Sequence, residues 1–544
     1  MGENNFVKRK KNHSNEIIEY ILTIITVINI LMIAKSLGLY GIGYFAIAMT
    51  FIYLVISFVS GWTGNFLAKY IKGRSTRKQY RNASNFFRGS LLFIGISSLI
   101  FATALALFGN SVGKFLFKDI HIGLCICISA PIVFLYSISV VFSGYFKGMG
   151  INRPVLIYQV IRCFVTFTGS IYFMKITMNY GAKVSALLQN ESITYIYGAF
   201  GAIAGFVAGQ LIGFITLFVF WILFHSELSR LVQSDSSRYS ESILDCIRMV
   251  CISGIVSGTK NVLFLCAPMI NYILYLSFDK TMIGSAGIAL GGSLFGIALP
   301  CMLLFIPLFM LWNQKAYKGI NTLIKNEDYN QIRSKHFNMI LGLCTFGLFI
   351  TVSFAVLSPI LTKALLISLT ELQSTLILCF ITCSVFVIGE VIHIRLNLLM
   401  NNKAFIYLSS LLGFVIQTAC FMLGFKVLNM GVYSILFGTA VNAIVLNLLC
   451  IFRLGKRIRF GSASIRRLIM GLIVSFAGVL IVLLVYQLFA KSLNGIVLFL
   501  ISFIPGFIIY LLGMVFLQII DYDEADQIPF GSVILQVARL LHRE

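Results

Sequence analysis

Three basic residues lie inside apolar stretches of the sequence, where a charge is costly. Arg162, Lys260 and Arg395 each fall within a run long enough to cross a bilayer. Arg162 and Lys260 have no obvious acidic partner on their own runs, so both are predicted to face a cavity and bind an anion, and a guanidinium suits phosphate in particular. Gln159 lies near Arg162 and Asn271 shares the face of Lys260 at helical spacing, so both join this predicted substrate site.

A structural interpretation of these bases stays open. Arg162 and Lys260 could instead reach the membrane surface or bind a backbone carbonyl. Arg395 lies near a predicted cytoplasmic end of its run, so it either contacts the substrate or reaches the surface.

Glu390 is a second candidate for chemistry. It is the one acidic residue well inside a run, and His393 follows three residues later on the same helical face. Residues at this spacing can pair. The two are predicted either to relay a proton or cation, or to form a buried pair that fixes helix packing.

The sequence shows no catalytic set. Gly-x-Ser-x-Gly, metal-ligand spacings, phosphate loops and carboxylate pairs within one run are all missing. The cysteines lie almost all within apolar runs without paired Cys-x-x-Cys motifs, so they are interpreted as small apolar side chains. We therefore predict a protein that is not an enzyme and that uses no cofactor and no metal.

The elements that carry these residues are predicted to be transmembrane helices. The chain has 544 residues, 59% hydrophobic and 11% charged, whereas a soluble domain is usually about a quarter charged. Apolar runs of roughly 20 residues recur, each long enough to cross a hydrocarbon core of about 30 Å, and in a bilayer such runs must be helices. The prediction is an all-α polytopic membrane protein with about fourteen spans: 17–34, 43–68, 89–108, 121–146, 154–178, 194–224, 249–277, 283–311, 337–361, 375–400, 404–425, 431–452, 468–490 and 495–519.

Basic residues are concentrated in alternate predicted loops. With both termini in the cytoplasm, most of the 42 Lys and Arg residues lie on the cytoplasmic side, as the positive-inside rule requires. This predicts a multi-pass protein of the cytoplasmic membrane. The net charge of +23 is spread over short loops, which favours contact with anionic phospholipids and argues against nucleic acid.

Similar segments recur in the two halves at an offset of about 250 residues. The segment 65–73 resembles 312–319, and 149–154 parallels 399–404, with both copies of each pair on the predicted cytoplasmic side. A parallel duplication gives two lobes with a site between them. The predicted organisation is a cytoplasmic N-terminus (1–16), an N-lobe (17–224), a cytoplasmic linker (225–248), a C-lobe (249–452), two further helices (468–519) and a cytoplasmic tail with an interfacial helix (520–544).

Glycines spaced by four predict a face for close helix packing. Gly201, Gly205 and Gly209 lie on one side of their helix. A second, less regular face of the same kind comprises Gly287, Gly291 and Gly296.

Several segments resemble one branch of the MOP flippase superfamily. The segment 142–161 is similar to the fourth-to-fifth helix connection of the branch that contains stage V sporulation protein B and polysaccharide-biosynthesis proteins, and 197–205 is similar to its sixth helix. Residues 306–309 with 326–333 resemble its eighth helix and the following loop, and 34–44 resemble its first extracellular turn. The shared order of these segments covers nearly the whole chain.

The resemblance implies two six-helix lobes around a central cavity, two added helices, and alternating access. Members move lipid-linked sugars, such as undecaprenyl-pyrophosphate precursors, to the outer leaflet for cell-wall, spore-cortex or surface polysaccharide. A lipid-linked pyrophosphate sugar is therefore the implied substrate, and envelope-synthesis enzymes are candidate partners.

The first apolar run departs from two related branches. Residues 17–34 lack the arginines of the lipid II flippase branch and the aspartate of the drug-and-toxin extruders. Two other functions stay open. One is a cation-coupled exporter of the MATE type, with Glu390 and His393 as its coupling site, and the other is a membrane scaffold for a sporulation or envelope complex.

Overall fold

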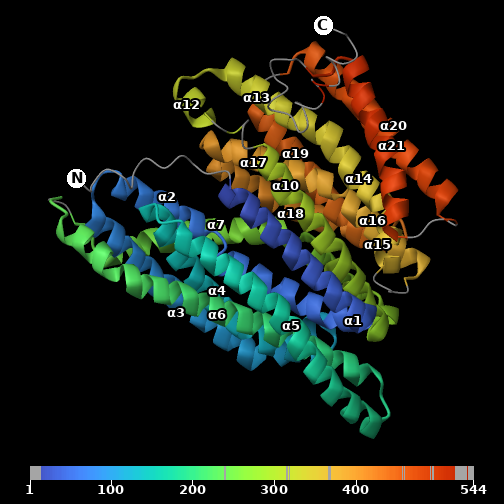
Figure 1. Ribbon diagram of the computed structural model, residues 1–544, viewed down its shortest axis with the longest axis horizontal. Coiled ribbons are helices and arrows are strands. Elements are labelled where there is room, and N and C mark those ends of the chain that lie inside the picture. The colour runs from blue at the N-terminus through green and yellow to red at the C-terminus, as the bar shows by residue number, and fades with distance from the viewer. Residues whose placement is uncertain are drawn as a thin grey trace. The chain divides into compact units, whose positions relative to one another are not determined.

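The computed structural model describes residues 14–237, 240–313, 317, 319–364, 369–455, 458, 460–490, 492, 495–520, 534 and 536. Within these ranges every regular element is a helix, as predicted (Figure 1). The predicted N-terminal segment 1–16 and the tail helix in 520–544 lie almost wholly outside the described residues.

The chain divides into two compact units, Met1–Gly296 and Ile297–Glu544. The first unit contains α1 (Ser14–Val59), α2 (Thr63–Ser75), α3 (Tyr80–Val112), η1 (Gly113–Phe117), α4 (Ile120–Met149), α5 (Arg153–Leu188), α6 (Ser192–Gln233), α7 (Ile243–Leu265), α8 (Ala267–Phe278), η2 (Lys280–Met282) and α9 (Ser285–Gly291). The π-helical segment η3 (Gly292–Ala298) contains the boundary. The lobe limits expected at 224 and 249 stay a prediction.

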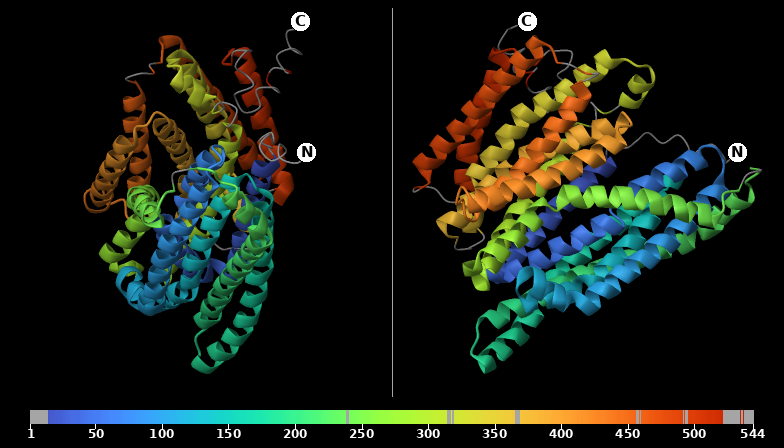
Figure 2. Two further views of the ribbon diagram at one scale, coloured as in Figure 1. Left: turned by 90° about the vertical axis from the view of Figure 1, so that its left-hand side faces the viewer. Right: turned by 180° about the vertical axis from the view of Figure 1, so that it is seen from behind.

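The second unit is built from shorter helices. They are α10 (Leu299–Trp312), α12 (Ile320–Lys325), α13 (Tyr329–Gly342), η4 (Leu343–Gly347), α14 (Leu348–Val356), α15 (Ser358–Ala364), α16 (Glu371–Thr382), α17 (Ser384–Leu399), α18 (Lys403–Lys426), α19 (Tyr433–Gly455), α20 (Ser462–Phe489) and α21 (Gly495–Phe516). Figure 2 shows α20 and α21 running side by side as a hairpin.

The number of spans agrees with the prediction of about fourteen. Among the described residues, twelve helices are long and apolar enough to cross a membrane, and there are thirteen if α7 and α8, which meet at a bend of 59°, form one span. Helix α1 has 46 residues, or about 69 Å, more than twice the roughly 30 Å of a hydrocarbon core. Helix α1 therefore supplies two spans, although it is counted as one among these twelve or thirteen.

The two halves of α1 meet at Gly38, whose φ of 64° and ψ of −176° are not helical. A β-carbon strongly disfavours this left-handed φ, whereas glycine adopts it freely. The turn between the predicted spans 17–34 and 43–68 is thus made by one residue.

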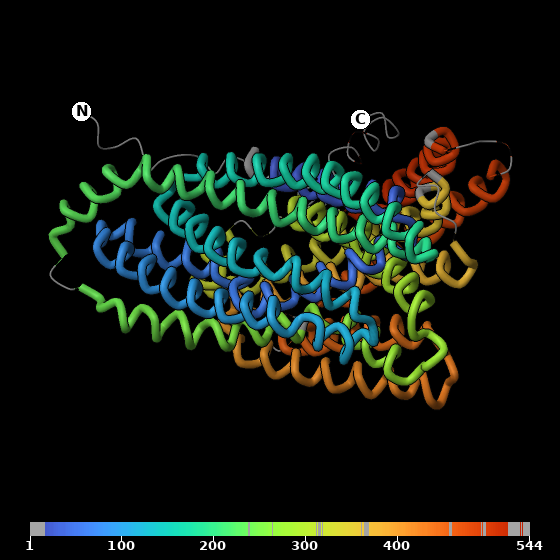
Figure 3. Tube along the Cα trace, turned by 90° about the horizontal axis from the view of Figure 1, so that it is seen from below, coloured from blue at the N-terminus to red at the C-terminus, as the bar shows by residue number. Residues whose placement is uncertain are grey.

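Glycines set the distance between α5 and α6 in the first unit, as predicted. A β-carbon at Gly205 would lie 2.2 Å from the Cα atom of Ser170, and one at Gly209 would lie 2.9 Å from the Cα atom of Thr166. Such distances leave no room for a side chain, so the two backbones touch directly. The two helices run antiparallel along their length (Figure 3).

Glycines also bring α9 and η3 against the second half of α1. A β-carbon at Gly291 would lie 2.4 Å from Ile47, and one at Gly296 would lie 2.6 Å from Ile42. On the α1 side, Gly43 leaves room for the carbonyl group of Ile288, which would lie 2.2 Å from a β-carbon at that position. The second predicted glycine face is therefore also a packing face: Gly291 and Gly296 pack on α1, whereas Gly287 packs on Leu276 of α8 and Met282 of η2.

The segment that joins α6 to α7 is tied to the start of α3. Glu241 is buried and forms an ion pair with Arg74, while the hydroxyl of Tyr70 donates to its Oε2 atom at 2.7 Å. The Glu241 amide donates to Asn82 Oδ1 at 2.8 Å, and Asn85 Nδ2 donates to the Glu241 carbonyl at 2.8 Å. These contacts hold the start of α7 against α2 and α3 of the first unit.

Asp235 makes a second attachment of the same segment. Its carboxylate accepts hydrogen bonds from the backbone amides of Arg81, at 2.7 Å, and Ser237, at 2.8 Å. Burial raises the pKa of Asp235, but these hydrogen bonds outweigh burial and hold the pKa below its ordinary value.

In the second unit, α20 and α21 pack on η4 and α14. Ser475 donates to the carbonyl of Thr345 at 2.9 Å, and the ring of Tyr510 stacks on Phe349 with centroids 5.0 Å apart. Gly478 lets Phe349 approach, because a β-carbon there would lie 3.0 Å from its ring. The two C-terminal helices are therefore part of the second unit.

Candidate functional site

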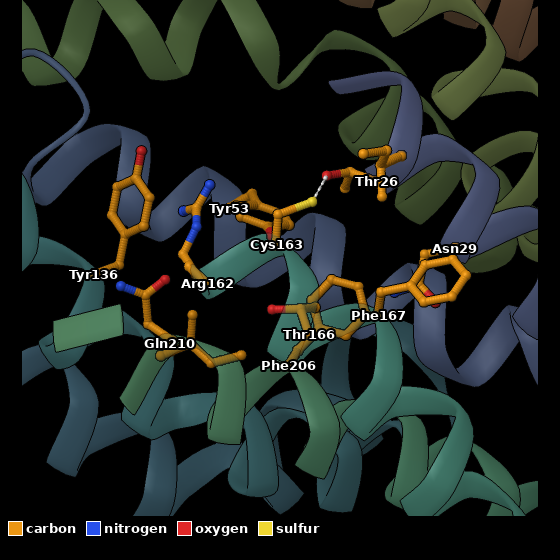
Figure 4. A pocket seen from close by; sticks show the side chains of 12 residues that line it. Thr26, Asn29, Tyr53, Tyr136, Arg162, Cys163, Thr166, Phe167, Phe206 and Gln210 are labelled. Atoms are coloured by element: carbon orange, nitrogen blue, oxygen red, sulfur yellow. Dashed lines mark hydrogen bonds between the residues drawn. The ribbon is translucent and has the colours of Figure 1, made fainter. Parts of the chain in front are cut away.

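A small pocket between α1, α4, α5 and α6 contains the strongest of the predicted site residues. The pocket lies wholly in the first unit and holds about 60 Å³ (Figure 4). That volume exceeds the roughly 10–15 Å³ that one water needs, and it suits a few waters or one small anionic group. The lining residues are Ile25, Thr26, Asn29, Tyr53, Ile132, Tyr136, Arg162, Cys163, Thr166, Phe167, Phe206 and Gln210.

Arg162 is the cation of this pocket. Its guanidinium carbon lies 5.5 Å from the ring centroid of Tyr158, and its stem lies along α6, where a β-carbon at Gly213 would be 3.1 Å from Arg162 Cβ. Figure 4 shows the side chain between Tyr136 and Tyr53. Within the described ranges no carboxylate lies within 4.0 Å of this guanidinium, so its charge is available to an anion.

Hydrogen bonds between helices hold the pocket walls. Gln210 Nε2 lies 3.3 Å from Ser139 Oγ and 3.4 Å from the hydroxyl of Tyr158, which joins α6 to α4 and α5. Ser170 Oγ donates to Asn29 Oδ1 at 2.9 Å and joins α5 to the first half of α1. Polar side chains of the pocket walls are thus hydrogen-bonded to one another, whereas Arg162 has no hydrogen bond to another described side chain.

Lys260 and Asn271 lie on other helices of the same unit, outside the pocket lining. Lys260 is half-buried on α7 and has no carboxylate within 4.0 Å among the described residues. Asn271 is fully buried on α8, beyond the 59° bend. The structure therefore does not bring these two residues to the Arg162 pocket.

Gln159 also lies outside the pocket. Its Nε2 atom is 3.4 Å from Glu19 Oε1, the same oxygen that Lys147 contacts at 3.2 Å. These three exposed side chains connect α1, α4 and α5 near their predicted cytoplasmic ends. In the structure Gln159 therefore makes a hydrogen bond between helices.

Arg395 lies on α17 in the second unit. Its guanidinium carbon is 4.1 Å from the ring centroid of Tyr317, and the Tyr317 hydroxyl donates to the carbonyl of Ile392 at 3.2 Å. The cation is thus held against an aromatic face, which is a stabilising contact.

Glu390 and His393 are both buried on α17, with exposed fractions of 2% and 3%. The buried Glu390–His393 pair, one of the two alternatives from the sequence, is not formed among the described residues, where no nitrogen of His393 lies within 4.0 Å of the carboxylate. His393 Nδ1 instead lies 2.7 Å from Asn447 Oδ1 on α19.

Sequence reasoning missed the aromatic and amide residues that complete the pocket, among them Tyr53, Tyr136 and Gln210. Gln210 carried a usable signal, because an amide that follows Gly209 inside an apolar run must find partners in the bundle. The tyrosines carried none, since the chain has 23 of them.

The chain is a multi-pass α-helical membrane protein, and its fold is shared with solved transporters of the MOP superfamily. No protein-family profile matches the sequence. The structure is similar to that of the lipid II flippase MurJ in an inward closed conformation, with a TM-score of 0.57 and 13% identity over 93% of this chain and 99% of that one. It is similar to the eukaryotic MATE transporter AtDTX14, with a TM-score of 0.58 and 14% identity over 85% of this chain and 96% of that one.

Among curated proteins, the sequence is similar to Stage V sporulation protein B of Bacillus subtilis (strain 168). The two are 25% identical over 192 residues, which is 35% of each chain. The match thus spans about a third of that relative's length. It agrees with the branch that the sequence motifs indicate.

Proposed function

We propose that this protein is a flippase for lipid-linked sugars. It moves a saccharide attached through phosphate or pyrophosphate to a long lipid across the cell membrane, by alternating access, with both termini in the cytoplasm. The observation that carries the proposal is the Arg162 guanidinium, which lines a pocket between four helices without a carboxylate beside it among the described residues.

The pocket suits the anionic part of such a lipid. A cation held in an apolar bundle is costly unless it meets an anion, and a planar guanidinium matches the oxygens of phosphate. A volume of about 60 Å³ suits one phosphate group rather than a saccharide. The sugar is therefore proposed to bind elsewhere, with Lys260, Arg395, Gln159 and Asn271 as the remaining candidates.

The similar proteins support a transport role and not catalysis. One is a lipid II flippase and others are MATE transporters. The basic loops are proposed to contact anionic phospholipids, and enzymes of envelope synthesis are proposed to supply the substrate or to consume the product.

Flipping of a fluorescent probe tests the proposal. The purified protein is placed in vesicles with a polyprenyl-pyrophosphate disaccharide that carries a fluorophore, and a membrane-impermeant quencher reports the leaflet that holds the probe. Replacing Arg162 by Gln removes hydrogen bonds to a charged group, each worth about 1.5–3 kcal/mol, so we expect a rate about 10- to 100-fold lower at limiting probe.

Arg153→Gln is the matched control, because Arg153 begins the same helix and is exposed. It should flip the probe at the wild-type rate. Equal rates for Arg162→Gln and Arg153→Gln would remove Arg162 from the substrate site, and no flipping by the wild-type protein would refute the proposed function.

A second function, cation-coupled export of small organic molecules, is favoured by the buried Glu390. In that case Glu390→Gln abolishes efflux and Arg162→Gln leaves it intact. A membrane scaffold would tolerate both substitutions.

A further inference from the structure

The Arg162 pocket carries a single positive charge. Of the twelve described side chains that line it, Arg162 alone is ionised at neutral pH, and the others are apolar, aromatic, hydroxyl, amide or thiol groups. Lys260, the other predicted base of the first unit, is not among them. A charge inside an apolar helix bundle is costly unless an opposite charge meets it. A ligand group with one negative charge therefore matches this pocket best.

The size of the pocket leads to the same ligand group. A volume of about 60 Å³ gives room for about four to six water-sized atoms, at roughly 10–15 Å³ each. A single phosphate group has about this size, whereas a pyrophosphate group is nearly twice as large. Buried side chains keep the pocket from widening: Ile132 and Phe206 are 4% and 7% exposed, and the Phe206 ring packs on Phe45 with centroids 5.2 Å apart. The pocket thus has room for one phosphate.

Unpaired hydrogen-bond donors surround the guanidinium. Figure 4 shows the Arg162 side chain between Tyr136 and Tyr53, and among the described residues neither phenol hydroxyl has a hydrogen-bond partner. Thr26 and Gln210, in contrast, already donate to groups of the protein. The planar fork of a guanidinium and two hydroxyls supply enough donors for the two free oxygens of a phosphodiester. The donors of the pocket therefore match one phosphate that is esterified on both sides.

A pyrophosphate would bring a second negative charge that these residues do not balance. Mg²⁺ balances such charges in many proteins, where one or two carboxylates hold the ion together with phosphate oxygens. The described lining contains neither Asp nor Glu. One phosphate of a pyrophosphate could enter the pocket, but the other would then lie at the opening beside Tyr53, 45% of whose surface is exposed. That second phosphate would have no base beside it among the described lining residues.

We propose that the transported lipid carries its sugar through a single phosphate, and that the Arg162 pocket selects this phosphodiester over a pyrophosphate. Arg162 pairs with its one negative charge, and the hydroxyls of Tyr53 and Tyr136 donate to its two free oxygens. The inference rests on the proposed function, because it names the substrate class of the same site. It also gives the two tyrosines, which sequence reasoning missed, a role in recognition.

Two probes that differ by one phosphate test the selection. Both carry the same fluorescent disaccharide on the same polyprenyl chain, one through phosphate and the other through pyrophosphate, and an impermeant quencher reports the flipping rate of each in vesicles. The second charge of the pyrophosphate lacks about one interaction between charged groups, so the wild-type protein should flip the phosphate probe about 10- to 100-fold faster at limiting probe. Equal rates, or a faster pyrophosphate probe, would overturn the inference and leave the flippase proposal intact. Flipping of neither probe would refute the proposed function.

A second base in the pocket should shift the preference. Ile25 is a half-buried apolar residue of the lining, and Ile25→Lys supplies the positive charge that a pyrophosphate needs there. The ratio of the pyrophosphate rate to the phosphate rate should rise about tenfold in this variant. A ratio that stays at the wild-type value would contradict charge matching.

Two further variants control for charge elsewhere on the protein. Arg153 is exposed at the start of the same helix as Arg162, so Arg153→Gln should keep the wild-type ratio. Lys260→Gln should keep this ratio as well, because Lys260 does not line the pocket. A loss of pyrophosphate flipping alone in Lys260→Gln would show that Lys260 supplies a second charge, and it would overturn the single-charge pocket.

Binding in detergent separates the two proposals. The ligands are two short-chain isoprenyl disaccharides, joined through phosphate or through pyrophosphate, and inorganic phosphate. The wild-type protein should bind the phosphate analogue about 10- to 100-fold more tightly than the pyrophosphate analogue. Tyr136→Phe keeps the ring but removes one hydroxyl, so it should weaken binding of the phosphate analogue about tenfold.

Each outcome of the binding measurement decides one proposal. If the phosphate analogue binds with this preference but no probe is flipped, the proposed function fails and the one-phosphate pocket stands. Equal binding of the two analogues to the wild-type protein would overturn the inference, whether or not the variants fold. Equal binding of inorganic phosphate and the phosphate analogue would make the pocket a site for free phosphate and refute the assignment of a lipid carrier.

Discussion

A single methyl group at Gly205 should separate α5 from α6. Its β-carbon would lie 2.2 Å from both the Cα and the N atom of Ser170. Ordinary contacts begin near 3.4 Å, so the backbones must move apart by roughly 1.2 Å, because a helix backbone cannot turn aside as a side chain can. Overpacking of this kind costs about 1–3 kcal/mol.

Gly169→Ala provides the control at the same crossing. A β-carbon at Gly169 would lie 3.6 Å from the Cα atom of Gly205, which is ordinary contact. Both substitutions gain the same helix propensity, up to about 1 kcal/mol. The difference between the two variants therefore isolates the steric term, which we expect to be about 1–3 kcal/mol.

The assay is unfolding of the purified protein in detergent, followed by the loss of monodisperse protein with temperature. Gly205→Ala should unfold below the wild-type temperature, and Gly169→Ala at or above it. Flipping should fall as well in Gly205→Ala, because Gly213 on the same face supports the stem of Arg162. Equal unfolding temperatures for the two variants would refute the argument that direct backbone contact sets this helix distance.

Three further outcomes follow from the contacts between elements. Glu241→Gln should lose about 1–3 kcal/mol of stability, because it leaves Arg74 without its carboxylate partner in a partly buried position. Thermal unfolding measures this loss. An unchanged unfolding temperature would show that other contacts hold the segment before α7. Because folding lowers the pKa of Asp235, its carboxylate stabilises the protein above about pH 4, the ordinary aspartate range, and this stabilisation is lost as the pH falls through the pKa of the folded state. Asp235→Asn should remove this pH dependence of stability from unfolding measured across pH. A pH dependence that the variant retains would contradict the prediction. Ser475→Ala should cost about 0.5–1.5 kcal/mol through the lost bond to Thr345. A wild-type unfolding temperature would show that α20 is held in place without this hydrogen bond.

The sequence predicted the features that depend on local patterns. Apolar length predicted the spans, including the pair on either side of Gly38, because the bilayer imposes one length on every span. The spacing of Gly205 and Gly209 predicted a packing face, because a helix repeats its surface every three to four residues. Arg162 was singled out because a charge inside an apolar run is expensive.

The missing parts depend on contacts between distant segments. Helical spacing places His393 beside Glu390, but the His393 ring lies toward α19, where Asn447 is 54 residues away in the chain. Likewise, nothing in the α7 sequence reveals that Glu241, just before it, is bound by Arg74 and Tyr70. A pattern within one helix cannot predict which residue of a distant segment will be its partner, because the packing of the other helices sets the distance between the two.

The one-residue turn at Gly38 has a mechanical consequence. The half of α1 before it contributes Thr26 and Asn29 to the Arg162 pocket. The half after it contributes Tyr53 to the same pocket and touches α9 through Ile47 and η3 through Ile42. With a single residue between them, the two halves have little freedom to tilt independently. A shift of α9 should therefore move both α1 sides of the pocket wall together, and a few extra glycines beside Gly38 would let Thr26 and Asn29 move independently of Tyr53.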